Sequence, residues 1–159
     1  MNDDIKLSFF KEKYQNDLFK FYLPEDIEIF TSLPKKILSS PILDEDKKPV
    51  VILLNGIPIG FFGLHLGDEV LEYKNNPNAI LLRYFSINYP YQGKGYAKKA
   101  LRLLPSFIKN NFKGINEVLL GVNKRNMPAQ KLYEKSDFKD TGLRRMGPVG
   151  LQYVLSLYL

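Results

Sequence analysis

The chain has 159 residues, a formal net charge of +6 at pH 7 and 45% hydrophobic residues. This length predicts a single domain, residues 1–159, that can bury a core, and the apolar content excludes an intrinsically disordered chain. No apolar run approaches the roughly 20 residues of a membrane-spanning helix, and the acidic residues 1–4 lack the apolar core of a signal peptide. We therefore expect a globular cytoplasmic protein without a membrane partner.

The cysteine and histidine content limits the chemistry. Without cysteine the chain has no disulfide, no thiolate nucleophile and no Cys-ligated zinc. Its one histidine, His65, excludes a site with several histidine ligands, so we expect no metal. Because His65 lies on an apolar segment, a structural role suits it better than a catalytic one.

Charge is divided unevenly along the chain. Residues 1–80 hold nine Lys/Arg and 13 Asp/Glu, whereas residues 81–159 hold 14 Lys/Arg and four Asp/Glu. The basic half could attract nucleic acid, an acidic membrane or a phosphorylated ligand, or it could simply be a solvated surface. No helix-turn-helix, zinc or RNA-binding motif accompanies the charge, so we expect no nucleic-acid partner.

The first quarter of the chain predicts a strand and two helices. Residues 5–10 alternate weakly, as in a strand, and the apolar spacing over residues 14–22 is helical. Pro24 ends or redirects that helix, and residues 25–31 form a short second helix that breaks before Pro34.

A β-hairpin follows. The charged residues 41–49 predict a loop before it. Residues 50–54 are apolar and β-branched, Asn55-Gly56 is a type I′ turn signal, and residues 57–65 return as the second strand.

Beyond the hairpin, strands and helices alternate. The turn-rich residues 67–78 lead to an apolar strand over residues 79–87. A helix over residues 98–110 has an apolar stripe and contains Pro105, which should kink or shorten it. Residues 117–122 predict the next buried strand.

The C-terminal part predicts one more helix and a closing strand. Asn126 is a suitable N-cap, with Pro128 in the first turn of a helix that runs to about Lys135. Residues 151–159 predict the last strand. The order of elements indicates an α+β fold without internal repeats or an interdomain linker.

A glycine-rich turn, residues 92–97, lies between the apolar strand and the helix that follows it. Gly93 and Gly95 lack a Cβ atom, so the main chain can turn sharply and admit an anion closely. The free N–H groups and the dipole of the helix start favour such an anion, although two glycines alone also fit an ordinary turn. The spacing excludes a Walker A loop, and the position in the chain excludes a dinucleotide-binding fingerprint.

A second motif follows the glycine turn in a fixed order. Gln92, Gly95 and Ala97 match the pattern Q-x-x-G-x-G/A. After the next strand come Asn126 and a helix with Ala129, Leu132, Tyr133, Glu134, Lys135 and Phe138. Together the two motifs resemble the acetyl-CoA pyrophosphate loop and the following helix of the GNAT superfamily of acetyl-CoA-dependent N-acetyltransferases.

The resemblance implies an α+β fold. It predicts a GNAT-like mixed, mostly antiparallel central sheet flanked by helices. The sheet would split between the strand before the glycine loop, residues 79–87, and the next strand, residues 117–122. Acetyl-CoA would enter that split as the co-substrate.

The resemblance also implies a coenzyme site. The main chain of Phe85, Ser86 and Ile87 would pair with the pantetheine amides, and the Ile87 N–H would polarise the thioester carbonyl. Asn126 would hydrogen-bond the pantetheine arm, or it is a plain helix cap. Asp137 stands where the family usually has a glycine, which implies a small local cost. The pyrophosphate would lie against the loop of Gln92, Gly93, Lys94, Gly95, Tyr96 and Ala97.

In the family, a tyrosine at the motif position of Tyr133 is often the general acid. A phenol of pKa ~10 is protonated at neutral pH and can donate to the leaving thiolate. The alternative is a core tyrosine whose hydroxyl is bonded to the main chain. The general base is not identifiable, because residues 79–87 contain no carboxylate. Three upstream carboxylates would reach the site through water or are solvated loop charges: Asp68, Glu69 and Glu72.

The predicted function is transfer of an acetyl group from acetyl-CoA to a primary amine by direct attack, with Tyr133 as the general acid. The acidic first half suggests a small cationic, polyamine-like acceptor, while aminoglycosides, amino-acid amines and protein amines stay open. The alternative is a non-catalytic acyl-CoA-binding sensor or scaffold of the same fold. We expect a monomer or a homodimer.

Overall fold

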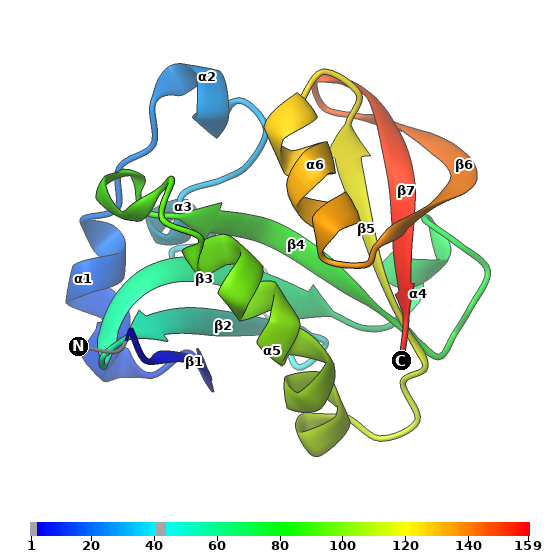
Figure 1. Ribbon diagram of the computed structural model, residues 1–159. Helices are drawn as coiled ribbons and strands as arrows, with labels where there is room; N and C mark the ends of the chain where they lie inside the picture. Colours follow the sequence, from blue (N-terminus) through cyan, green and yellow to red (C-terminus); the bar gives the residue numbers. More distant parts are fainter. Residues whose placement is uncertain (1–2, 41–43) are drawn as a thin grey trace.

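The computed structural model describes residues 3–40 and 44–159. Its centre is a seven-stranded sheet with the strand order β1-β2-β3-β4-β5-β7-β6 (Figure 1). The strands are β1 (Ile5–Phe9), β2 (Lys47–Leu54), β3 (Ile57–His65), β4 (Ala79–Ile87), β5 (Glu117–Asn123), β6 (Lys139–Gly147) and β7 (Gly150–Tyr158). The α-helices are α1 (Gln15–Phe19), α2 (Glu25–Glu28), α3 (Pro34–Leu38), α4 (Asp68–Leu71), α5 (Tyr96–Asn111) and α6 (Met127–Lys135). Only β4 and β5 are parallel neighbours in the described sheet, so the predicted mixed, mostly antiparallel architecture is confirmed.

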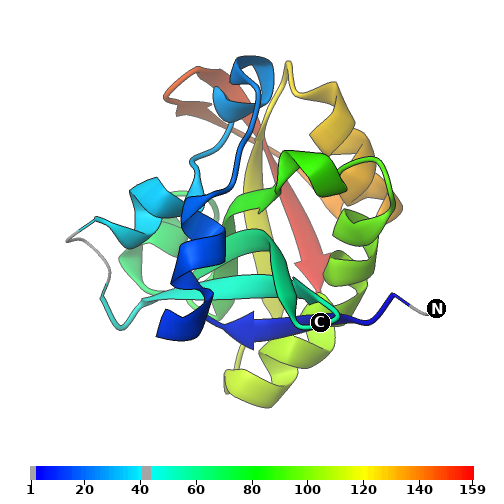
Figure 2. The same ribbon diagram turned by 90° about the vertical axis from the view of Figure 1, so that its left-hand side faces the viewer.

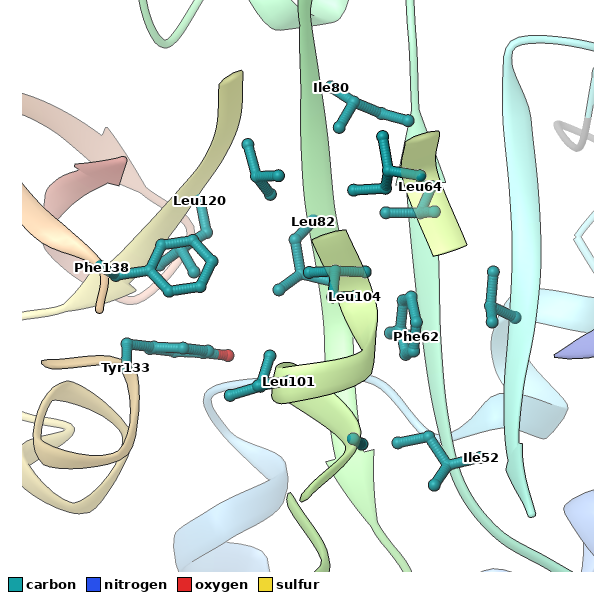
Figure 3. Close-up of a cluster of buried hydrophobic side chains, with 14 of the residues drawn as sticks. Ile52, Phe62, Leu64, Ile80, Leu82, Leu101, Leu104, Leu120, Tyr133 and Phe138 are labelled. Atoms are coloured by element: carbon teal, nitrogen blue, oxygen red, sulfur yellow. The ribbon is translucent and has the colours of Figure 1, made fainter. Parts of the chain in front are cut away.

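Helices cover both faces of the sheet. α5 and α6 lie on one face, and α1, α3 and α4 lie on the other (Figures 1 and 2). The largest buried cluster packs beneath α5 and α6 and includes Phe62, Leu104 and Leu120 (Figure 3). Smaller clusters surround Leu18 and Val70. Burial on both faces explains why β3 and β4 are apolar along nearly their whole length.

Local signals account for the hairpin and for the length of α5. Asn55 (φ 49°) and Gly56 (φ 84°) both have positive φ, as the predicted type I′ turn requires. The shortening expected at Pro105 does not occur. The helix α5 runs over 16 residues, from Tyr96 to Asn111, with Pro105 inside it. Its buried stripe holds the helix against the sheet through Tyr96, Ala100, Leu101, Leu104 and Ile108.

Several elements differ from the sequence-based prediction. The helix expected over residues 14–22 is the shorter α1, and α4 lies within residues 67–78, where only a turn-rich connection was predicted. α3 begins at Pro34, where only a break was predicted, because proline in the first turn loses no intrahelical hydrogen bond. β2 begins at Lys47, so the predicted loop over residues 41–49 is wrong in its last part, and residues 41–43 lie outside the described chain. β6 gave no clear apolar signal, because this edge strand is mostly exposed.

β4 and β5 separate partway along their length, and the predicted split of the sheet is confirmed. Their parallel pairing runs only from Ala79↔Glu117 to Leu81↔Leu119, whereas β5 stays paired with β7 over all seven of its residues. Beyond these pairs, the edge of β4 that faces β5 has no strand partner in the described part of the chain. Tyr84 (φ 59°) lies beside a register shift between β3 and β4, so a β-bulge bends β4 at this point.

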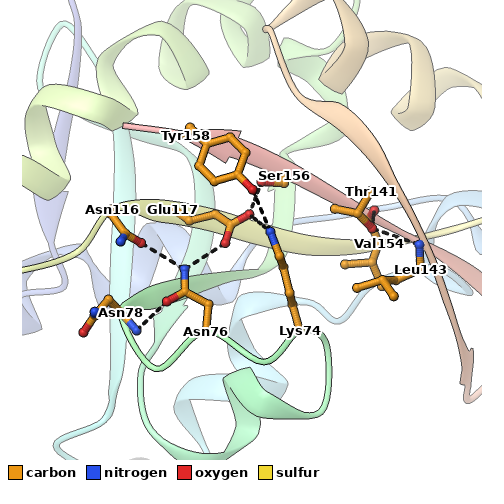
Figure 4. A network of polar contacts seen from close by, with 10 residues as sticks. All are labelled: Lys74, Asn76, Asn78, Asn116, Glu117, Thr141, Leu143, Val154, Ser156 and Tyr158. Atoms are coloured by element: carbon orange, nitrogen blue, oxygen red, sulfur yellow. Dashed lines mark hydrogen bonds and ion pairs between the residues drawn. The ribbon is translucent and has the colours of Figure 1, made fainter.

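A polar cluster fastens the closed end of the split (Figure 4). Glu117 is fully buried and accepts hydrogen bonds from Lys74 and Asn76, which follow α4, and from Ser156 on β7. Burial alone would raise the pKa of Glu117, but the bonds from Lys74, Ser156 and Asn76 outweigh burial and hold that pKa below its ordinary value. The cluster therefore joins the loop before β4 to β5 and β7.

Glu117→Gln tests this cluster. We expect it to lower the free energy of unfolding at pH 7 by roughly 2 kcal/mol, because Lys74 loses its buried counter-charge. Since the folded-state pKa of Glu117 is lowered, the stabilisation is complete above the carboxyl's ordinary value of 4.5 and is lost as the pH falls through the folded value. In urea unfolding, the gap between wild type and variant should close below that pH. A gap that stays constant down to acid pH, or an equal gap in the exposed control Glu134→Gln, contradicts this account.

Candidate active site

A cleft of about 980 Å³ opens where β4 and β5 separate. Its walls come from β4, β5, the glycine loop, α6, residues 23–32 around α2, and the tip of the β6–β7 hairpin. The structure brings ten predicted site residues together here: Phe85, Ser86, Ile87, Gln92, Gly93, Gly95, Tyr96, Ala97, Asn126 and Tyr133. The remaining one, Lys94, is exposed in the loop and does not line the cleft.

The glycine loop leaves main-chain donors unused. Gly93 (φ 75°) and Gly95 (φ 83°) are left-handed, and a Cβ on either would meet no atom within 4 Å. The N–H groups of residues 93–95 donate to no other described residue, and α5 starts at Tyr96 without a side-chain cap or an acidic residue in its first turn. The two glycines therefore allow the positive φ angles of the loop. The free N–H groups at the start of α5 are suited to binding an anion.

Gln92 fastens the loop to the end of β4. Its Nε2 donates to the Ile87 carbonyl at 2.8 Å. The Asn88 N–H donates to a carbonyl of β3, also at 2.8 Å. Because main-chain groups alternate between the two edges of an antiparallel strand, the N–H groups of Phe85 and Ile87 face the cleft edge of β4, and those of Ser86 face β3.

Tyr133 projects from α6 into the buried wall of the cleft (Figure 3). Its ring packs edge-on against Phe85 and Phe138, with ring centroids 6.3 Å and 5.6 Å away. Only 9% of the residue is exposed, yet its hydroxyl is bonded to no other described residue, contrary to the alternative of a satisfied core tyrosine. Burial raises the pKa of Tyr133 well above its ordinary value, so the phenol stays protonated.

Both ends of α6 are capped locally. Asn126 Oδ1 accepts from the Ala129 N–H at 3.4 Å, so the cap interpretation is confirmed, and its Nδ2 donates to no described residue. Asp137 adopts the left-handed conformation (φ 73°) at the C-terminal end, beside a bond from the Phe138 N–H to the Tyr133 carbonyl. Asp therefore fills the glycine position at a cost of about 1 kcal/mol.

Sequence reasoning missed a half-buried cluster of His65, Glu69 and Arg83 beside the cleft. Glu69 accepts from His65 Nδ1 at 2.9 Å and from Arg83 Nη1 at 2.6 Å. The hydrogen bond from His65, with help from Arg83, lowers the pKa of Glu69 to about 2 despite its partial burial. The four-residue spacing of His65 and Glu69 was the only local signal, and it matches no motif.

The carboxylates among the described cleft-lining residues are Asp26 and Glu28, both on α2. The three upstream carboxylates considered from the sequence, Asp68, Glu69 and Glu72, do not line the cleft. Glu69 is not a solvated loop charge, because its oxygens are held by two partners and it stays ionised. It is therefore a weak candidate for a general base.

Comparisons with known proteins show the family of this chain. The chain belongs to the acetyltransferase (GNAT) family, which it matches over residues 10–138. It is 47% identical over 160 residues to the uncharacterized N-acetyltransferase YbbJ of Bacillus subtilis (strain 168), with 100% of both chains covered. It is 33% identical over 95 residues to the spermine/spermidine N(1)-acetyltransferase of the same organism, with 60% of this chain and 61% of that protein covered.

The fold is also shared with a solved structure. Aminoglycoside acetyltransferase AAC(6')-Ib in complex with coenzyme A and kanamycin is similar, with a TM-score of 0.79 and 20% identity over 98% of this chain and 95% of that chain. The protein is thus an acetyl-CoA-dependent N-acetyltransferase, which favours an enzyme over a non-catalytic sensor. Within residues 3–40 and 44–159, no helix is long and apolar enough to cross a membrane.

Tyr133→Phe should leave the fold intact. Because the hydroxyl is bonded to no described residue, we expect the free energy of unfolding to change by less than roughly 0.5 kcal/mol. Tyr133→Ala removes a buried ring and should cost about 3–5 kcal/mol. Urea unfolding of both variants checks this. A large loss of stability in Tyr133→Phe would show that the hydroxyl has a structural partner.

Proposed function

We propose that this chain, as one domain of residues 1–159, transfers the acetyl group of acetyl-CoA to a small primary amine in the cleft between β4 and β5. One observation carries the proposal. Among the described residues, a strand edge without a strand partner, a helix start without a side-chain cap and a phenol without a hydrogen bond all border the same cleft.

The cleft offers a complementary group for each part of the coenzyme. The pyrophosphate would lie against the N–H groups of residues 93–97, with Lys98 of the first turn adding positive charge. The pantetheine amides would pair with the main chain of Phe85, as an added strand would. Ser86 would keep its neighbours in register from the β3 side, and the Ile87 N–H would be left for the thioester. Asn126 Nδ2 would donate to the same arm.

The transfer forms a bond between the amine nitrogen and the acetyl carbon, breaks the carbon–sulfur bond and releases one proton from the amine. The Ile87 N–H would donate to the carbonyl oxygen, where negative charge develops. Tyr133 would donate to the leaving sulfur as the general acid. Since a thiol is more acidic than this phenol, Tyr133 contributes chiefly through a hydrogen bond to the developing thiolate.

A small amine acceptor is supported by the cleft and by the relatives. Asp26 and Glu28 on α2 line the cleft and would attract an ammonium group and accept its proton. Similar proteins are named for spermine and spermidine, and a structural neighbour was solved with kanamycin. Amines of these classes are therefore the first acceptors to test, the polyamine-like ones among them.

Gly95→Ala tests the phosphate-binding loop. The added Cβ meets no protein atom, so the positive φ alone should cost about 1 kcal/mol of stability. We expect a weaker affinity for coenzyme A, by roughly tenfold or more, because the loop N–H groups shift. Gly114→Ala is the matched control, since its φ of 75° and open surroundings are alike but it lies outside the cleft. Equal affinities of the two variants in calorimetry would contradict the assignment.

Tyr133→Phe tests the chemistry. In assays of thiol release from acetyl-CoA with an amine panel, we expect kcat to fall by at least about tenfold while the Kd for coenzyme A is unchanged. The reason is that the lost hydroxyl acts on the leaving sulfur and not on binding. Unchanged turnover would remove Tyr133 from the mechanism, and no thiol release with any amine would contradict the proposed function itself.

A further inference from the structure

The cleft wall carries charges of both signs. Outside the glycine loop and α5, its charged side chains are Asp26, Glu28, Lys36, Arg83 and Arg125. A pure polycation would meet three positive side chains there as well as two negative ones. The first-half acidity seen in the sequence is therefore not the charge that the acceptor meets in the cleft.

Arg83 is the most firmly positioned of these cations. Its Nη1 donates to Glu69 at 2.6 Å, and its guanidinium carbon lies 4.6 Å from the ring centroid of Tyr84. Glu69 is itself held by His65. A guanidinium fixed from two sides has lost its rotamer freedom before any ligand arrives, which favours binding.

Most N–H donors of Arg83 have no acceptor among the described residues. A guanidinium has five N–H donors, and Glu69 is the only described residue that accepts from this one. The Arg83 side chain is 32% exposed and lines the cleft. Planar pairs of N–H donors match the two oxygens of a carboxylate or phosphate.

The position of Arg83 suits a second anchor for the acceptor. It precedes Phe85 by two residues on β4, so their Cα atoms lie at most roughly 7 Å apart. The Phe85 ring packs against the ring of Tyr133, whose hydroxyl would face the leaving sulfur. An oxyanion bound at Arg83 would therefore hold an amine of the same molecule on the side of the cleft where that sulfur lies.

The other two cations are less suitable. Arg125 already donates from Nη2 to the Val149 carbonyl at 2.8 Å and follows β5 beside the N-cap of α6. Lys36 is exposed on the short helix α3 and forms no ion pair with a described carboxylate.

We propose that the acceptor is a primary amine that also carries an oxyanionic group, and that Arg83 binds this group. The inference rests on the proposed function and narrows its substrate class, since simple polyamines lack an oxyanion. Carboxylates and phosphate esters share the required chemistry, and the assay separates them.

The test compares amines in matched pairs at saturating acetyl-CoA, following thiol release. The pairs are lysine and cadaverine, ornithine and putrescine, β-alanine and its amide, and phosphoethanolamine and ethanolamine. We expect kcat/KM to be at least about tenfold higher for the oxyanionic member of one carboxylate pair or of the phosphate pair, mostly through KM. The pair that shows the preference identifies the oxyanion.

Arg83→Gln should abolish that preference while the Kd for coenzyme A is unchanged. Arg144→Gln is the matched control, because it removes the same charge from a side chain that pairs with Asp140 and does not line the cleft. Arg83→Lys, which keeps the charge without the planar fork, should retain part of the preference.

Two results overturn the proposal without touching the proposed function: turnover in which no oxyanionic member of any pair is preferred, or a preference that survives in Arg83→Gln. If no amine releases thiol although coenzyme A binds, the proposed function fails. Calorimetry of the same amine pairs with coenzyme A present then tests whether Arg83 binds an oxyanion. Equal binding of both members of every pair would overturn the proposal for Arg83.

Discussion

The structure depends on the short length over which β4 and β5 are paired. The two parallel strands pair at three positions and then separate, although β5 continues beside β7 and β4 continues beside β3. An unpaired strand edge inside a sheet is unfavourable unless something else satisfies its main-chain groups. Here that edge borders a cleft of about 980 Å³, so a ligand with its own amide groups would supply the missing partner.

Two features, one at each end of the split, maintain this geometry. At the closed end, the fully buried Glu117 is bonded to Lys74, Asn76 and Ser156, so the strands cannot separate further without exposing a charge (Figure 4). At the open end, the left-handed Tyr84 bends β4, and Arg83 beside it is tied to Glu69. A strained residue at this point is consistent with a functional site, because bulges often redirect main-chain groups next to active sites.

The sequence predicted what depends on local residue types. Gly93 and Gly95 can take the positive φ of the loop, Asn126 can cap a helix, and Asn55-Gly56 can make a tight turn, so each was predictable from its own neighbourhood. The split of the sheet was predicted only from the family resemblance, since no residue type in β4 indicates that its pairing with β5 stops after three positions. The ion pairs next to the cleft were not predictable, because Glu69 and Arg83 are 14 residues apart and Lys74 and Glu117 are 43 apart.

The central claim is that main-chain N–H groups on both sides of the split bind the coenzyme. Amide hydrogen exchange with and without saturating coenzyme A measures those groups directly. We expect slower exchange at residues 93–97 and at Phe85 and Ile87, with little change in β1, β2 and β6. Unchanged exchange at these amides, or protection confined to another surface, would contradict the account.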